Sequence, residues 1–128
     1  MIVPISEFQG KTFVRIKTLE DAIIFIENDG TEYIMYHEPD CCERVTLEDI
    51  IGDISDLIDT PIISAEERTS GQNPFDIVKN CQDDSFTWTF YDIATIRGYV
   101  TIRWYGESNG YYSESVDIHK FTTLKNKI

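Results

Sequence analysis

The chain has 128 residues, of which 41% are hydrophobic and 27% are charged, as in an ordinary folded globular domain. These values exclude disordered, collagen-like and coiled-coil proteins, and the length predicts one domain spanning residues 1–128. Eleven Lys and Arg against 23 Asp and Glu give a net charge of −12, which disfavours nucleic acid and anionic membrane surfaces as partners.

The acidic excess lies almost entirely in the first half of the chain. Residues 1–68 contain 16 acidic and 5 basic side chains, whereas residues 69–128 contain 7 and 6. A surface that tolerates an anion is therefore expected in the second half. No apolar run is long enough to span a membrane and no signal-peptide pattern opens the chain, so we expect a cytoplasmic protein.

Three strands open the expected fold. Residues 12–17 alternate apolar and polar side chains, 22–26 form a continuous apolar run, and 31–36 read as a further strand. Asp29 and Gly30 tolerate a positive φ angle, which predicts a hairpin between the last two segments. We therefore expect a three-stranded meander.

The next segment has the spacing of an amphipathic helix, and Thr46 followed by Asp49 resembles a capping box. Pro61 would end this helix. The apolar positions are Leu47, Ile50, Ile51, Ile54, Leu57 and Ile58. The acidic positions are Glu48, Asp49, Asp53, Asp56 and Asp59. This acidic face is either a solvated surface or a partner-binding face that mimics DNA phosphates or docks on a basic host protein.

Strand patterns dominate the second half of the chain. The expected strands are 61–67, 85–91, 98–105 and 111–118, with turns at 70–74, 83–84 and 106–110. The sequence thus predicts an α+β fold, in which an antiparallel sheet of about six or seven strands carries one amphipathic helix packed on one face.

Alternation in the last strands predicts two faces. The side chains expected beneath the helix are Phe86, Trp88, Phe90, Val100, Ile102 and Trp104. The outer face would carry hydroxyls, aromatic rings and one guanidinium, which could bind a nucleotide- or sugar-like, small anionic ligand. The candidate ligand-binding residues on or beside this face are Tyr91, Tyr99, Arg103, Tyr105 and Asn109. A solvated surface, another protein or a homo-oligomer contact are the alternatives for this face.

The densest group of potential metal ligands lies at 37–43. A zinc site would use His37, Cys41 and Cys42, with a fourth ligand from Cys81 or His119. The spacing matches no standard zinc finger, and a turn with one buried cysteine is the alternative. Three cysteines, two of them adjacent, form no disulfide framework, which favours a reducing cytoplasm. We find no phosphate-binding loop or catalytic triad pattern, and assign neither a catalytic residue nor a cofactor.

A resemblance to a known family rests on two long stretches, YHEPDCCERVTLEDIIGDISDLIDTPIISAEE at 36–67 and TWTFYDIATIRGYVTIRWYGESNGYYSESV at 87–116. They resemble a family of small bacteriophage and prophage proteins of unknown function. The resemblance implies an accessory protein that binds a host protein or a host defence component without catalysis. The alternatives are a small-ligand binder that uses the outer sheet face, and a metal- or thiol-dependent enzyme at His37, Cys41 and Cys42.

Overall fold

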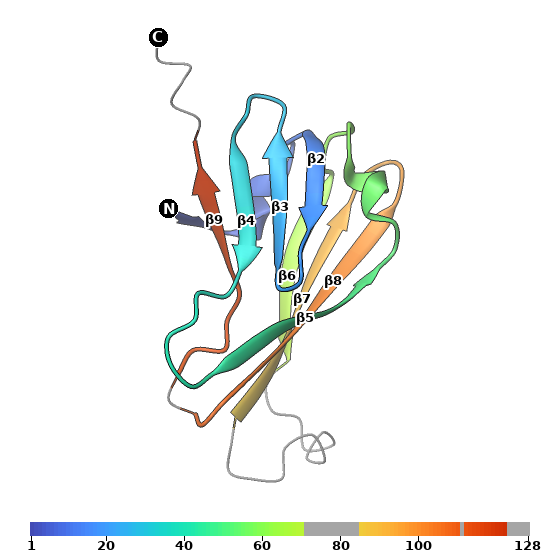
Figure 1. Cartoon of the computed structure of the whole chain (residues 1–128). Helices are drawn as coiled ribbons and strands as arrows, with labels where there is room; N and C mark the ends of the chain where they lie inside the picture. The colour runs from blue at the N-terminus through green and yellow to red at the C-terminus, as the bar shows by residue number, and fades with distance from the viewer. Residues whose placement is uncertain (71–84, 111, 123–128) are drawn as a thin grey trace.

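Two antiparallel sheets packed face to face make up the protein (Figure 1), as seen in a computed structural model that describes residues 1–70, 85–110 and 112–122. The strands are β1 (Ile2–Val3), β2 (Phe13–Thr18), β3 (Ala22–Glu27), β4 (Glu32–Tyr36), β5 (Arg44–Ile51), β6 (Ser64–Ser70), β7 (Ser85–Ala94), β8 (Tyr99–Ser108) and β9 (Asp117–Phe121). One sheet has the order β1-β9-β4-β3-β2 and the other the order β5-β8-β7-β6. Two single-turn 3-10 helices, η1 (Ile5–Phe8) and η2 (Ile54–Leu57), complete the described elements.

The expected α+β fold is wrong, because the described residues contain no α-helix and form a β-sandwich of two sheets instead of one. None of their helices is long and apolar enough to cross a membrane. The segment expected as an amphipathic helix is β5 followed by η2. The expected strand at 111–118 is also displaced: β9 begins at Asp117 and pairs with β1 and β4 of the five-stranded sheet.

A β-bulge explains why β5 and η2 imitate helical spacing. Leu47 pairs with Trp104 and Asp49 with Arg103, so Glu48 is an extra residue in β5. An extra residue shifts the alternation of a strand by one position. As a result Leu47 and Ile50 both pack against the core, and the turn of η2 then adds two more residues to it. The spacing of three to four residues along Leu47, Ile50, Ile54 and Leu57 thus arises without a helix.

The expected meander is confirmed. β2 pairs with β3 and β3 with β4, both antiparallel. Gly30 has a φ of 95°, and the Thr31 amide donates to Asp29 Oδ1 over 2.9 Å, as expected for the turn between β3 and β4. Of the turns expected at 70–74 and 83–84, Ser70 is the last residue of β6, and the remaining residues lie outside the described part of the chain.

One hydrophobic core lies between the sheets. Phe8 of η1 sits in edge-to-face contact with three rings, those of Phe13, Phe25 and Tyr33, with centroids 4.8 to 5.1 Å apart. The facing sheet contributes mostly aliphatic and aromatic side chains of its two central strands. These are Tyr91 and Ile93 of β7 with Val100, Ile102 and Trp104 of β8.

The expected faces of β7 are reversed in the structure. Tyr91 pairs with Ile102 and Ile93 with Val100, and all four are almost completely buried in the core. Residues between them point the other way, since side chains alternate along a strand. The prediction that Phe86, Trp88 and Phe90 line the core together with Val100, Ile102 and Trp104 is therefore wrong. Only the β8 residues do so, and the three aromatic residues of β7 lie on the outer face.

The junction between β5 and η2 provides a test of the fold. Gly52 has a φ of 109°, and a Cβ there would lie 2.5 Å from the carbonyl oxygen of Tyr99. Gly10 also has a positive φ, of 84°, but a Cβ there would meet no atom within 4 Å. We expect Gly52→Ala to lower the free energy of unfolding by about 1 to 3 kcal/mol more than Gly10→Ala, because it adds overpacking to the backbone cost. Urea denaturation measures both, and equal losses would contradict this packing.

Candidate functional site

An arginine–aromatic face lies on the outside of the four-stranded sheet. We define it by Arg68 of β6, Trp88 and Phe90 of β7, and Arg103 and Tyr105 of β8. The guanidinium carbon of Arg68 lies 4.7 Å from the centre of the Phe90 ring, and that of Arg103 lies 5.2 Å from the centre of the Trp88 ring. The Trp88 and Tyr105 rings are 4.8 Å apart. At these distances each guanidinium attracts its ring through a cation–π interaction, and the two rings attract each other.

Two carboxylates orient the two arginines. Asp92 accepts from Nε of Arg68, from its Nη2 over 3.2 Å, and from the Thr101 hydroxyl over 2.8 Å. The hydrogen bond from Arg68 holds the pKa of Asp92 below its usual value. Asp49 lies 3.8 Å from Nη2 of Arg103. The side chains of Arg68 and Arg103 are still 56% and 38% exposed, so both guanidinium groups remain within reach of a partner.

The expected ligand-binding residues do not form one group. Arg103 and Tyr105 belong to the arginine–aromatic face, and Tyr99 lies on the same side of β8, 61% exposed. Asn109 follows the end of β8. Tyr91, by contrast, is 1% exposed on the inner side, where its hydroxyl donates to the carbonyl of Val116 over 3.0 Å.

Sequence reasoning missed three members of the face, namely Arg68, Trp88 and Phe90. Both sets of alternating residues in β7 contain large rings, so the apolar pattern alone did not show which set faces inward. Tyr91 and Ile93, near the end of the strand, could have indicated which side of β7 faces the core. These two residues lie on the side of β7 that faces the other sheet, and they pair with the strongly apolar Ile102 and Val100.

Four of the five acidic residues expected on one helical face make separate local contacts. The bulge residue Glu48 accepts from the Thr46 hydroxyl over 2.6 Å, and Asp49 faces Arg103. Asp53 caps η2 by accepting from the Ser55 amide over 3.0 Å. Asp56 lies within η2 and is packed against Gly98. Each of the four carboxylates thus has a contact of its own within β5, η2 or the neighbouring strands.

His37 ties the loop after β4 to the segment that leads into β9. Its Nδ1 lies 2.7 Å from the carbonyl oxygen of Ser115, and its Nε2 lies 2.6 Å from Oε2 of Glu43. A carbonyl and an ionised carboxylate can only accept hydrogen bonds. Each ring nitrogen thus faces a hydrogen-bond acceptor, and the ring is almost fully shielded from solvent.

Glu43 is the acceptor around which this loop folds. Besides the His37 ring, it accepts from the amides of Asp40 and Cys41 over 2.6 and 3.0 Å. These three donors favour the ionised form, with the Cys41 amide contributing most, and lower the pKa of Glu43 from 4.5 to about 2.

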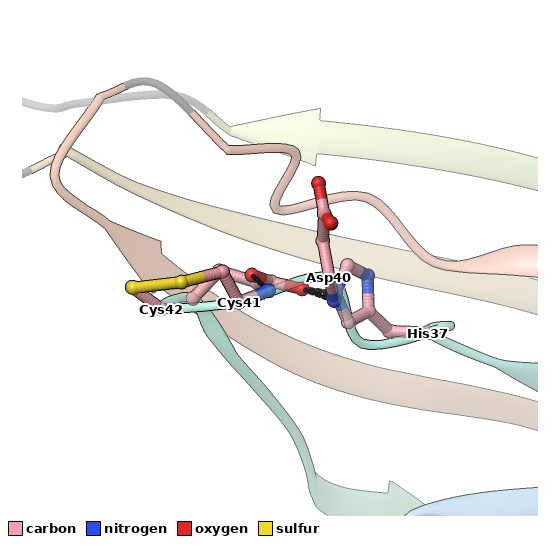
Figure 2. Close-up of a disulfide and its surroundings, with 5 residues drawn as sticks. His37, Asp40, Cys41 and Cys42 are labelled. Atoms are coloured by element: carbon pink, nitrogen blue, oxygen red, sulfur yellow. Dashed lines mark hydrogen bonds and ion pairs between the residues drawn. A yellow bond between two sulfur atoms is a disulfide. The ribbon is translucent and has the colours of Figure 1, made fainter.

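The candidate zinc ligands that the structure describes are not arranged as a metal site. Cys41 and Cys42 are joined in a disulfide, although the sequence favoured reduced thiols, and Figure 2 shows the two sulfurs at the far end of the loop from the His37 ring. His119 stacks on Tyr36 with centroids 4.6 Å apart, and Cys81 lies outside the described residues. Within the part of the chain that the structure describes, no group of three or more His, Cys, Asp or Glu side chains could hold a metal.

The fold and these surfaces define a small β-sandwich domain with a structured arginine–aromatic face. The chain belongs to the DUF7448 family, a domain of unknown function, which matches residues 6–118. The expectation that most of the chain belongs to a family of unknown function is therefore confirmed. Neither a curated protein nor a solved structure matches the chain significantly.

Acid titration tests the loop around Glu43. Its pKa is about 2 in the folded loop and near 4.5 in an unfolded chain. The ionised carboxylate therefore stabilises the loop fully above pH 4.5, and this contribution decreases as the pH falls and is lost below about 2. We expect the amide NMR signals of Asp40 and Cys41 to titrate with a midpoint near 2. Glu43→Gln should remove this transition, whereas Glu38→Gln in the same loop should keep it, and a midpoint near 4.5 would contradict the arrangement.

Proposed function

We propose that this protein acts by binding a partner protein through the arginine–aromatic face, and not by catalysis. One observation carries the proposal: two arginines stack on two aromatic rings on the outer face of the four-stranded sheet, and their guanidinium groups stay partly exposed. Tryptophan, tyrosine and arginine are the residues that contribute most to binding energy in protein interfaces.

Preorganisation supports binding at this face. A free arginine side chain loses conformational entropy when a partner immobilises it. Asp92 and the Phe90 ring already restrict Arg68, and Asp49 and the Trp88 ring restrict Arg103. Asp92 takes two of the five N–H donors of Arg68. The remaining donors can reach carboxylates or backbone carbonyls of a partner.

The partner in this proposal is a host protein or a component of host defence, and the protein is a phage- or prophage-type accessory protein in the host cytoplasm. The resemblance of segments 36–67 and 87–116 to phage and prophage proteins supports this assignment. The second candidate is a small anionic, nucleotide- or sugar-like ligand held by Arg103 and Tyr105, which uses the same guanidinium group. An enzyme at His37, Cys41 and Cys42 has less support, because the two sulfurs are bonded and both His37 nitrogens are engaged.

The test compares two double variants that remove the same charge. Arg68→Ala with Arg103→Ala truncates the arginine–aromatic face, whereas Arg15→Ala with Lys17→Ala truncates two exposed side chains of β2 in the other sheet. Affinity purification from a bacterial host extract, followed by quantitative mass spectrometry, measures the captured protein. We expect the Arg68→Ala, Arg103→Ala variant to capture at least about tenfold less of a partner protein than the wild type does. The Arg15→Ala, Lys17→Ala variant should capture as much of it as the wild type.

Two results would count against this proposal. Equal capture of the partner protein by both variants would show that the arginine–aromatic face does not contribute to binding. A copurified small molecule in native mass spectra that disappears with Arg103→Ala, without any captured protein, would favour the small-ligand candidate instead.

A further inference from the structure

A polar cleft lies on the inner side of the four-stranded sheet, beyond the end of the core. β7 and β8 have ten residues each, whereas the strands of the facing sheet have two to six. The long strands therefore extend past the facing sheet (Figure 1). The segment 112–116 covers part of this extension, and a Cβ at Gly106 would lie 2.7 Å from the Glu114 carbonyl oxygen. The remaining hollow has a volume of about 320 Å³, at the lower end of small-molecule sites.

Hydroxyl groups line the inside of this cleft. Thr69 and Thr89 are paired across β6 and β7, with Thr87 two residues before Thr89 on the same side. Thr87 donates to Glu114 over 2.7 Å. Thr89 is only 2% exposed, and its hydroxyl makes no hydrogen bond to another described residue. The hydroxyl oxygen is not sealed off from the cleft, so a ligand atom that enters the cleft can pair with it.

The cleft carries negative charge without a basic side chain among its described lining residues. Glu114 accepts from Thr87 and from Ser108, the latter over 2.6 Å, and is held in place. Glu67 stands on the edge strand at the mouth of the cleft and makes no ion pair within the described ranges. Partial burial, followed by the nearby charge of Asp117, raises the pKa of Glu67 above its usual value. An anionic ligand is therefore disfavoured, and a cation would relieve the repulsion.

We propose that the cleft binds an organic ammonium group, carried by a lysine side chain of a polypeptide or by a free diamine. An ammonium group has three N–H donors and no acceptor. The Glu67 carboxylate and the hydroxyls of Thr89 and Thr69 offer a matching set of acceptors on one side of the sheet. This site goes beyond the proposed function, because it lies on the opposite side of β7 from the arginine–aromatic face.

Calorimetric titrations with two amines test the proposal and separate the two sources. The probes are 1,4-diaminobutane and Nα-acetyl-lysine methylamide, and the neutral control is 1,4-butanediol. We expect at least one amine to bind at neutral pH, and the diol not to bind. Stronger binding of the lysine derivative identifies a polypeptide side chain as the ligand, and stronger binding of the diamine identifies a free amine.

Variants of two adjacent glutamates test whether the amine binds in the cleft. Glu67→Gln should weaken amine binding by about tenfold or more, which corresponds to about 1.4 kcal/mol. Glu66→Gln is the matched control, since Glu66 pairs with Asp92 on the other side of the same strand. Thr89→Val keeps the size of the side chain and should weaken binding severalfold, which preserves the test if Glu67→Gln fails to fold.

Carboxyl ¹³C NMR gives a second readout. A bound ammonium group favours the ionised carboxylate, so saturating amine should move the titration midpoint of Glu67 to lower pH. Three results would overturn the proposal: no binding of either amine at about 10 mM, where a millimolar site would be mostly filled; unchanged binding in both Glu67→Gln and Thr89→Val; or equal binding of the diol.

Discussion

The ten-residue pairing of β7 with β8 determines what each side of the four-stranded sheet presents. Its register buries Tyr91 and Ile93 against the facing sheet and turns Trp88 and Phe90 outward towards the arginines. A slip of one residue would exchange the two sets and bury the wrong side chains. Because the paired strands are longer than the facing sheet, the same register also places threonines beyond the core. The core, the arginine–aromatic face and the polar cleft thus depend on one alignment.

The two connections between the sheets are joined to each other by His37. One connection leads from β4 to β5 and contains His37 and Glu43, and the other leads from β8 to β9 and contains Ser115. The His37 ring lies within hydrogen-bond distance of both Ser115 and Glu43 and so links the two loops. The segment that covers the polar cleft is therefore anchored to the rest of the sandwich by a polar contact as well as by Val116 in the core.

Local patterns in the sequence predicted the elements that depend on local chemistry. β2, β3, β4 and the turn at Asp29 and Gly30 follow from the apolar patterns and turn residues, and the sequence also predicts strands at β7 and β8. The apparent helix failed because the bulge at Glu48 and the turn of η2 reproduce helical spacing. The face of β7 depends on contacts between residues far apart in the chain, and the sequence pattern allowed both choices. The arginine–aromatic face and the cleft could not be predicted without knowing which side of β7 faces the core.

We expect few positions in β7 to tolerate substitution. A strand at the surface of a sandwich usually accepts polar substitutions at every second residue, where it meets only water. In β7 the outward residues Trp88, Phe90 and Asp92 hold the arginines, and the inward residues belong to the cleft or the core. Both the outward and the inward residues of β7 therefore make contacts that a substitution would disrupt. We expect successive positions of β7 to be about equally sensitive to substitution. In β2 the exposed Arg15 and Lys17 should tolerate substitution better than their neighbours. Strand β7 would stand out in a mutational tolerance profile by lacking the period of two that marks an ordinary amphipathic strand.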